Sequence, residues 1–153
     1  MSEMANLTGS CECGNVHYQV TGDPVVTVAC HCNDCRKLSG SAFGTVIVVN
    51  ADDLKLTGDL NLWEKPADSG RRKQLFFCPR CGNRIYHQDP DAPELVRIRS
   101  GTLDLAELPE PRVHVYAARK QAWVNFTEGA TYFAGQPSGD KLHEAIAAAA
   151  LPD

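Results

Sequence analysis

The chain has 153 residues, of which 43% are hydrophobic and 22% charged, and its formal net charge is −4. One compact domain accommodates this length, and the acidic balance argues against nucleic-acid binding, which normally needs a basic face. No run approaches the roughly 20 apolar residues of a membrane helix, and residues 1–8 lack a signal-peptide pattern, so we expect a cytoplasmic protein with no membrane partner.

Most of the predicted elements are strands. Residues 16–20 alternate apolar and polar side chains, as a half-buried strand does, and residues 42–50 are rich in Val, Ile and Thr, as a more buried strand is. Further apolar runs, separated by turn-forming residues, predict strands at 54–56, 60–63, 74–77, 84–87, 95–100, 113–116 and 122–126. Short strands at this spacing are typical of a mainly β domain of several small sheets.

Two helices are predicted. The first is short, with Asn33 as its N-cap and residues 35–39 as its body. The second covers about 141–150, with its cap near Ser138 or Asp140, and its apolar side chains at helical spacing could pack on a sheet.

Seven cysteines stand in three tight groups. Since no export signal is seen, we expect a compartment that keeps thiols reduced, where clustered cysteines indicate metal binding or catalysis rather than disulfides. The odd number agrees, because seven cysteines cannot all pair within one chain. The groups are Cys11-x-Cys13, Cys30-x-Cys32-x-x-Cys35 and Cys78-x-x-Cys81.

The spacing favours a division into four and three. A four-cysteine cluster (Cys11, Cys13, Cys78 and Cys81) supplies the complete sulfur set of a closed structural zinc site. A three-cysteine cluster (Cys30, Cys32 and Cys35) remains, and three ligands leave an open position at which a substrate or water binds. The spacing therefore favours one closed four-sulfur zinc site and one three-sulfur group with a vacancy.

Two other interpretations stay open from spacing alone. A zinc ribbon would join Cys32 and Cys35 to Cys78 and Cys81, and would leave the other three cysteines without a role. Alternatively, several cysteines are buried reduced thiols without a metal.

The cysteine motifs resemble those of a known family, the glutathione-dependent formaldehyde-activating enzymes. The resemblance is carried by residues 9–14 (GSCECG), 30–40 (CHCNDCRKLSG) and 77–83 (FCPRCGN), in that order. It continues through residues 111–133, with His114, Trp123 and Phe133. Asn83 departs from the family pattern, in which a small hydroxyl residue often follows the Cys-Gly turn.

The resemblance implies a β-tent type of fold, with small coiled antiparallel sheets organised around a structural zinc held by the four-cysteine cluster. It assigns the three-cysteine cluster to a catalytic zinc with incomplete protein ligation. It spans residues 8–135, so we expect a flexible N-terminus at 1–7 and a helical extension at 136–153.

The resemblance also implies a reaction. Glutathione adds to formaldehyde to give S-hydroxymethylglutathione, which is the chemistry of a carbon–sulfur lyase run in reverse. The expected partners are therefore a small thiol such as glutathione and a small aldehyde. Relatives such as centromere protein V have other roles, so the alternative is a non-catalytic zinc module that carries a thiol or binds a protein.

Glutathione carries two carboxylates, so its pocket should offer cations. We expect Arg71, Arg72 and Lys73 to fill this role, with Arg36 second, against the alternative that they are solvated surface charges. His31, between two predicted ligands, is expected to point away from the metal. His87 and His114 are expected to be hydrogen-bonded structural residues.

Overall fold

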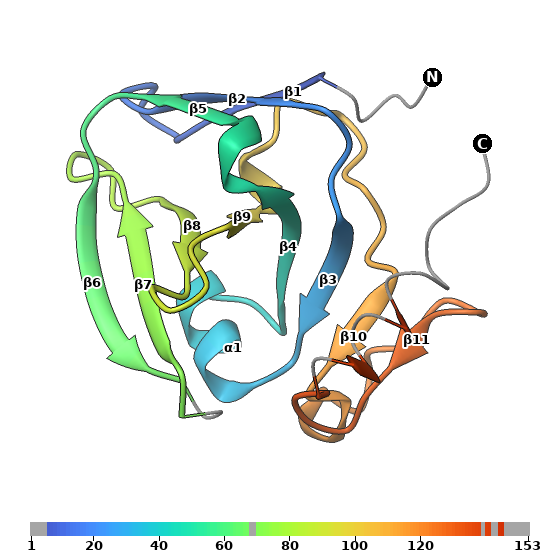
Figure 1. Ribbon diagram of the computed structural model, residues 1–153. Coiled ribbons are helices and arrows are strands. Elements are labelled where there is room, and N and C mark those ends of the chain that lie inside the picture. The colour runs from blue at the N-terminus through green and yellow to red at the C-terminus, as the bar shows by residue number, and fades with distance from the viewer. Residues whose placement is uncertain (1–5, 68–69, 139, 142–143, 146–153) are drawn as a thin grey trace. The chain divides into compact units, whose positions relative to one another are not determined.

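The computed structural model describes residues 6–67, 70–138, 140–141 and 144–145 (Figure 1). The chain forms two compact units. The first unit comprises Met1–Val25 and Ile47–Leu108, and the second comprises Val26–Val46 and Pro109–Asp153. The four-cysteine cluster belongs wholly to the first unit and the three-cysteine cluster wholly to the second.

A three-stranded antiparallel sheet of the first unit carries the first pair of cysteines. It consists of β1 (Asn6–Ser10), β2 (His17–Thr21) and β5 (Leu54–Thr57), in the order β1-β2-β5 (Figure 1). Alternate residues of β1 and β2 are buried, with Leu7 opposite Val20, as the period of a half-buried strand requires.

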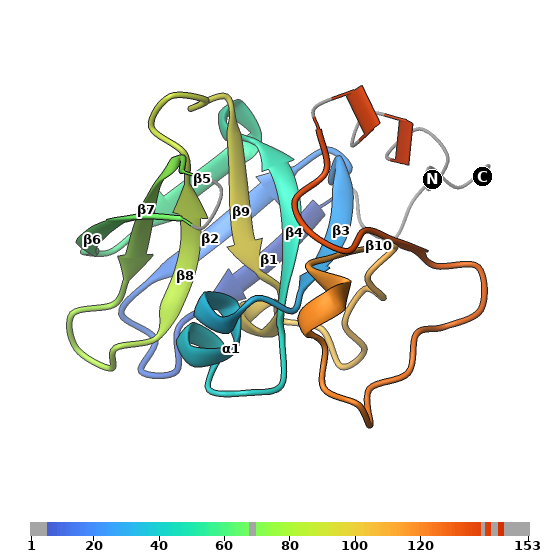
Figure 2. The same ribbon diagram turned by 90° about the horizontal axis from the view of Figure 1, so that it is seen from below.

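The other strands of the first unit carry the second pair of cysteines. Their order is β4-β9-β8-β7-β6, and β6 to β9 pair antiparallel. Figure 2 shows β7, β8 and β9 side by side. The bounds are β4 (Gly44–Asn50, in this unit from Ile47), β6 (Asn61–Pro66), β7 (Arg72–Phe77), β8 (Arg84–Gln88) and β9 (Leu95–Arg99), with 3₁₀ turns η1 (Ala51–Asp53) and η2 (Ser100–Thr102).

The core of the first unit is apolar and includes two of the cysteines. Cys11 and Cys78 are buried in one cluster with valine, leucine and isoleucine side chains of both sheets, among them Val16, Ile85 and Ile98. The sulfurs therefore sit where the hydrophobic packing of the unit converges.

The second unit positions the three-cysteine cluster. It contains β3 (Val26–Cys30), helix α1 (Asn33–Ser39), β10 (Val113–Val115), the 3₁₀ turn η3 (Ala117–Arg119) and β11 (Thr131–Tyr132). Its strand order is β11-β10-β3, and both pairs are parallel. The expectation of antiparallel sheets alone is therefore wrong for this unit. Parallel pairing arises because the chain makes a long crossover from β3 to β10 rather than a hairpin.

The sequence predicted most strands, but not all. The seven predicted strands at 16–20, 42–50, 54–56, 60–63, 74–77, 84–87 and 95–100 are confirmed within one to three residues at either end, and 113–116 matches β10. Residues 122–126 form no strand, and the Trp123 side chain is 72% exposed. Strands β1, β3 and β11 were not predicted.

The predicted helix after Cys32 is confirmed, with one correction to its start. The N-cap is Cys32 rather than Asn33, because the Cys32 sulfur accepts a hydrogen bond from the Cys35 N–H. Gly40 ends the helix in the left-handed conformation, with φ of 62°.

The C-terminal helix predicted for 141–150 is described only in part. The Ser138 hydroxyl accepts a hydrogen bond from the Lys141 N–H at 3.3 Å, as the predicted cap should. Residues 140–141 and 144–145 have helical backbone, and the rest of this segment (142–143 and 146–150) lies outside the described residues. The predicted boundaries at 1–7, 8–135 and 136–153 stay predictions. None of the described helices is long and apolar enough to cross a membrane.

Candidate functional site

Two turns present the four-cysteine cluster. Cys11 and Cys13 follow β1 in a turn closed by the Gly14 N–H, which donates to the Cys11 carbonyl at 3.1 Å. Cys78 and Cys81 follow β7 in a matching turn, in which the Gly82 N–H donates to the Cys78 carbonyl at 2.9 Å. Both glycines have positive φ, a backbone conformation that residues with a side chain rarely adopt.

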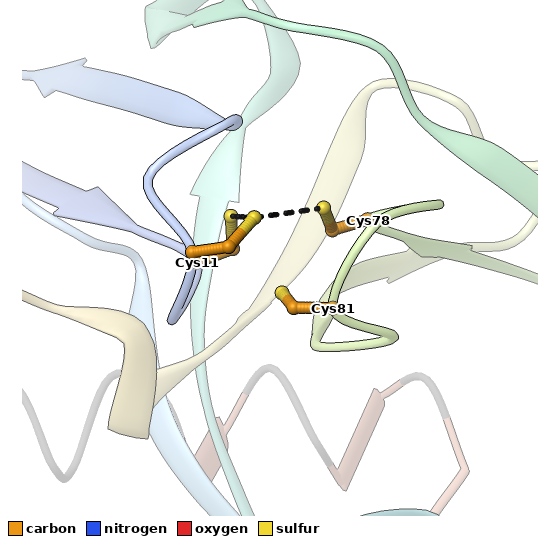
Figure 3. Close-up of side chains that lie close together, drawn as sticks. Cys11, Cys78 and Cys81 are labelled. Carbon is orange, nitrogen blue, oxygen red and sulfur yellow. Dashed lines mark hydrogen bonds between the residues drawn. The ribbon is translucent and has the colours of Figure 1, made fainter.

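The four sulfurs converge on one point, as Figure 3 shows for Cys11, Cys78 and Cys81. All four lie within 4.8 Å of one another. The Sγ–Sγ distance is 3.6 Å from Cys11 to Cys13 and 3.7 Å from Cys13 to Cys78, and no pair is a disulfide. Zinc–sulfur bonds of about 2.3 Å at tetrahedral angles place sulfurs about 3.8 Å apart. The spacing therefore fits a tetrahedral metal ion.

Hydrogen-bond donors surround the buried sulfurs of this cluster. The Val16 N–H donates to Cys11 Sγ at 3.3 Å, while the Arg80 N–H and the Asn15 side-chain amide donate to Cys78 Sγ at 3.4 and 3.6 Å. Such donors stabilise thiolates, which are the form that binds a metal. The cluster is therefore prepared for negative charge.

The pKa values of the cluster's thiols depend on a balance between burial, which raises them, and hydrogen-bond donors, which lower them. Burial raises the pKa of Cys78, but the N–H groups of Cys81 and Arg80 and the Asn15 amide outweigh it and lower the pKa to about 6. The Asn15 N–H lowers the pKa of Cys13, but burial and the three neighbouring sulfurs together raise it to about 11. The Cys78 thiol therefore ionises easily, whereas the Cys13 thiol needs a cation to do so.

The three-cysteine cluster is built at the junction of β3 and α1. Cys30 ends β3, Cys32 caps the helix and Cys35 lies in its first turn, and the three sulfurs lie within 4.8 Å of one another. Cys32 and Cys35 are 5% and 3% exposed. Hydrogen bonds with these two thiols, and then burial, raise the pKa of Cys30 strongly. No fourth Cys, His, Asp or Glu joins this cluster in the part of the chain that the structure describes.

The grouping of the sulfurs decides between the two zinc-site partitions that spacing left open. It matches the four-plus-three partition rather than the zinc ribbon. The donor sets are soft thiols in both clusters, and this is the ligand type that zinc accepts in proteins.

A buried histidine pair adjoins the three-cysteine cluster. His31 Nε2 lies 3.0 Å from His114 Nδ1, and both side chains are buried, at 1% and 7% exposure. The rings of Phe43 and Phe126 pack against His31 at centroid distances of 4.9 and 5.4 Å. Burial, and then the charges of His114 and Lys120, lower the pKa of His31 to about 4. His31 is therefore neutral at physiological pH.

Sequence reasoning missed this pair. His114 is hydrogen-bonded, as expected of a structural histidine, but its partner was not foreseen. The one signal in the sequence is that His31 follows an apolar run and His114 lies within one. In the structure, β10 pairs with β3 in a register that puts His114 opposite Ala29. A pairing between segments 83 residues apart has no local signature.

The three predicted glutathione-binding arginines have different surroundings. The Arg71 Nε lies 2.7 Å from the Asp89 carboxylate. Arg72 pairs with Glu64 at 3.2 Å and with Asp91 at 3.5 Å. Arg36 lies in α1 and is half-buried. Their role toward glutathione stays a prediction.

Comparison with known proteins places this geometry in a family. The family model of the glutathione-dependent formaldehyde-activating enzymes matches residues 6–119, about three quarters of the chain. The chain belongs to this family. The matched range contains all seven cysteines of both clusters. The family resemblance of the cysteine motifs is thereby confirmed, and the family's members are named as enzymes.

One relative extends this assignment, and one solved structure is similar in fold. A protein of Halomonas elongata named "Putative glutathione-dependent formaldehyde-activating enzyme" is 33% identical over 143 residues, which cover 86% of this chain and 88% of that protein. A crystal structure of a Rhodobacter sphaeroides protein has a TM-score of 0.52 and 21% identity, and the match covers 65% of this chain and 90% of that one. The second likeness supports the fold alone.

Proposed function

We propose that this protein is a zinc-dependent enzyme of the carbon–sulfur lyase type that joins glutathione and formaldehyde into S-hydroxymethylglutathione. The observation that carries the proposal is the three-cysteine cluster, in which three buried or half-buried sulfurs within 4.8 Å form a ligand set one short of tetrahedral. Family membership and the name of the Halomonas relative support the choice of substrates.

The two clusters would have different roles. The four-cysteine cluster would hold a structural zinc, because its ligand set is complete and two of its sulfurs belong to the core of the first unit. The three-cysteine cluster would hold the catalytic zinc. Zinc with an open position supplies Lewis acidity, which lowers the pKa of a thiol placed there.

The chain's own residues prepare the three-cysteine cluster for this work. The Cys35 N–H donates to Cys32 Sγ at 3.3 Å, which holds two of the ligands in register and stabilises the Cys32 thiolate. His31, which lies between Cys30 and Cys32 in the sequence, is buried, hydrogen-bonded to His114 and packed against Phe43 and Phe126. Neutral imidazoles there add no positive charge that would compete with a metal ion.

The size of the gain from thiol ionisation shows that most of any large rate acceleration must arise elsewhere. A free thiol with a pKa near 8.5 is a few per cent ionised at neutral pH, so complete ionisation gains roughly thirtyfold. Larger gains require both reactants to be held together, which is the effect that raises effective molarity. We therefore propose that the binding of glutathione, with Arg36, Arg71 and Arg72 as the predicted cations, matters as much as activation of its sulfur.

The test is an exchange measurement. With ¹³C-labelled formaldehyde and glutathione at equilibrium, NMR measures the rate at which label moves between the free hydrate and the thiol adduct. The zinc-loaded protein should raise this rate in proportion to its concentration, Cys32→Ser should not, and Ser41→Ala, an exposed change just after α1, should match the wild type. A protein that binds glutathione but leaves the rate at its buffer value is a thiol carrier and contradicts the proposal.

A further inference from the structure

The four-cysteine cluster has one buried side and one side that faces solvent. Cys11 and Cys78 are 4% and 0% exposed and belong to the apolar core of the first unit. Cys13 and Cys81, the second cysteine of each turn, are exposed, whereas no member of the three-cysteine cluster is. Buried structural cysteines are inert, and reactive ones are partly exposed. The open side is therefore where a reagent dissolved in water can modify the cluster.

Cys13 lies next to a buried sulfur of the opposite turn. Its Sγ is 3.7 Å from the Sγ of Cys78, a residue 65 positions away in the sequence. Figure 3 shows Cys78 on the turn that faces Cys11. Because Cys13 is not part of the core, its side chain can supply the movement that a disulfide bond of about 2.05 Å requires. A bond between the two turns is thus within reach.

Cys78 is prepared to act as the attacking sulfur in such a bond. The Arg80 N–H and the Asn15 amide donate to its Sγ at 3.4 and 3.6 Å. These donors stabilise a thiolate, the form that attacks an oxidised sulfur. Cys11 Sγ is as close to Cys13, at 3.6 Å. A bond between those two would close a loop with one intervening residue, which is costly because so short a segment is stiff.

We propose that Cys13 is an oxidation site through which a peroxide releases the structural zinc. The Cys13 thiolate attacks one oxygen of hydrogen peroxide, the O–O bond breaks, and the departing hydroxide takes up a proton to give water. The Cys78 thiolate then attacks the sulfur of the resulting sulfenic acid, and a second hydroxide leaves and is protonated. The two sulfurs lose two electrons in all, and the peroxide is reduced to two molecules of water.

The disulfide removes two of the four ligands. Cys11 and Cys81 alone do not complete the tetrahedral set of a structural zinc site, so the metal leaves. The Cys13–Cys78 bond ties the same two turns that the metal ties, and the first unit keeps its framework. A thiol reductant exchanges with the disulfide and restores the four sulfurs. The cluster is thus a reversible redox switch, whichever reaction the three-cysteine cluster catalyses.

The test follows the metal rather than the reaction. The parent protein is Cys32→Ser, in which only the four-cysteine cluster keeps a complete ligand set, so the zinc that is measured belongs to that cluster. Hydrogen peroxide is added and then removed with catalase, and a metal indicator should detect the release of about one zinc per chain. Peptide mapping by mass spectrometry, after alkylation of free thiols, should find Cys13 joined to Cys78. Dithiothreitol followed by zinc should restore the metal content.

Two histidine variants in this background identify the sulfur that reacts. Three cysteines and one histidine also form a structural zinc site, and both substituted positions are exposed. Cys13→His should therefore bind zinc and retain it in peroxide. Cys81→His keeps both Cys13 and Cys78, and it should release zinc as fast as the parent does. The same release from both variants, fast or slow, would overturn the assignment to Cys13.

Several other results would overturn the proposal. They are retention of zinc by the parent in peroxide, release without a disulfide, a disulfide between another pair of the four cysteines, and a sulfinic acid at Cys13, which thiols do not reduce. A parent that holds no zinc before peroxide is added would refute the structural site together with its release. If Cys13→His fails to bind zinc, the peptide map of the oxidised parent decides alone.

Discussion

The side-chain oxygen Oδ1 of Asn83 accepts a hydrogen bond from the backbone N–H of Glu12 at 3.0 Å, across 71 residues of sequence. Glu12 lies between Cys11 and Cys13, and Asn83 follows the turn that holds Cys78 and Cys81. The Asn83 amide nitrogen in turn donates to the Arg84 carbonyl at 3.3 Å. The residue that departs from the family pattern thus ties together the two turns that present the four sulfurs.

Replacing this residue should therefore weaken the first unit. We expect Asn83→Ala to lower the free energy of unfolding by about 1 kcal/mol, the usual net contribution of one hydrogen bond, because the Glu12 N–H loses its acceptor. Urea unfolding with zinc present measures this. Asn61→Ala, an exposed change on β6, serves as the control. An equal effect of the two substitutions would contradict the linking role of Asn83.

Zinc content should distinguish the two clusters. Protein purified under reducing conditions should hold about two zinc ions per chain, and either Cys32→Ser or Cys81→Ser should hold about one. The second change should also lower the unfolding temperature more, because the four-cysteine cluster shares the core of the first unit. Elemental analysis and calorimetry provide both readings. Unchanged zinc in Cys32→Ser would show that the three-cysteine cluster is not metallated.

The histidine pair should contribute to stability through its hydrogen bond. In His114→Ala, His31 Nε2 loses its partner while Nδ1 already lacks one, so a buried imidazole is left with no hydrogen bond. We expect a loss of about 1–3 kcal/mol in the free energy of unfolding. His114→Asn places an amide near the position of the His114 Nδ1 atom, and this variant should recover part of the lost free energy of unfolding.

The exposed His17 provides the control for that measurement, since His17→Ala should change the free energy of unfolding little. A His114→Ala variant as stable as His17→Ala would mean that the pair does not hold the second unit together.

Stability should fall in acid partly through His87. Burial, and then the charges of Arg99, Lys73 and Arg97, hold the pKa of His87 well below 6.5 in the folded chain. Below pH 6.5, His87 therefore binds a proton in the unfolded chain but not in the folded chain. As the pH falls, this group lowers the free energy of unfolding by about 1.4 kcal/mol per pH unit. Above pH 6.5 this contribution is constant.

The measurement is urea unfolding of the wild type and His87→Gln between pH 7.5 and pH 5.5. Because other histidines and the cysteines also take up protons in acid, the informative quantity is the difference between the two proteins. That difference should change only below pH 6.5, with the glutamine variant showing the shallower loss. Parallel curves throughout would contradict the assignment.

Close packing around Gly9 should make that position intolerant of a side chain. Gly9 lies opposite Tyr18 in the β1–β2 pair, and a methyl group there would overlap the Tyr18 ring and the Thr102 carbonyl. The ring cannot turn aside without breaking the 2.7 Å hydrogen bond between the Tyr18 and Thr102 hydroxyls. Gly9→Ala should cost about 1–3 kcal/mol in urea unfolding. Gly101→Ala, at a position with open space, should cost clearly less.

Local patterns in the sequence predicted what depends on near neighbours. The alternation of Val16, Tyr18 and Val20 predicted β2, and the spacing of Cys78 and Cys81 predicted a turn with two converging sulfurs. The four-plus-three grouping followed from the count of ligands that zinc requires. For β2 and for the turn, the signal and the structure lie within a few residues, whereas the grouping joins cysteines 65 residues apart.

What escaped prediction depends on distant contacts. The apolar segment 122–126 reads as a strand but finds no neighbour to pair with, and Trp123 is exposed. Strand β3 lacks alternation, since a strand buried on both sides shows a continuous apolar run. The burial of Arg99 was unforeseen, because composition places arginines at the surface and only the register of β8 and β9 brings this one to a buried face.

The parallel pairing of β10 with β3 sets an order in which the protein matures during synthesis. The last ligand of the four-cysteine cluster is Cys81, whereas Cys30 ends a strand whose parallel neighbour β10 is complete only when Val115 has been made. Since ribosomes release the chain from its N-terminus, the first set of sulfurs can close before β10 is available to the second. For the time needed to translate those residues, the three thiols intended for chemistry lack β10 beside β3, and they depend on the reducing capacity of the cell to remain unoxidised.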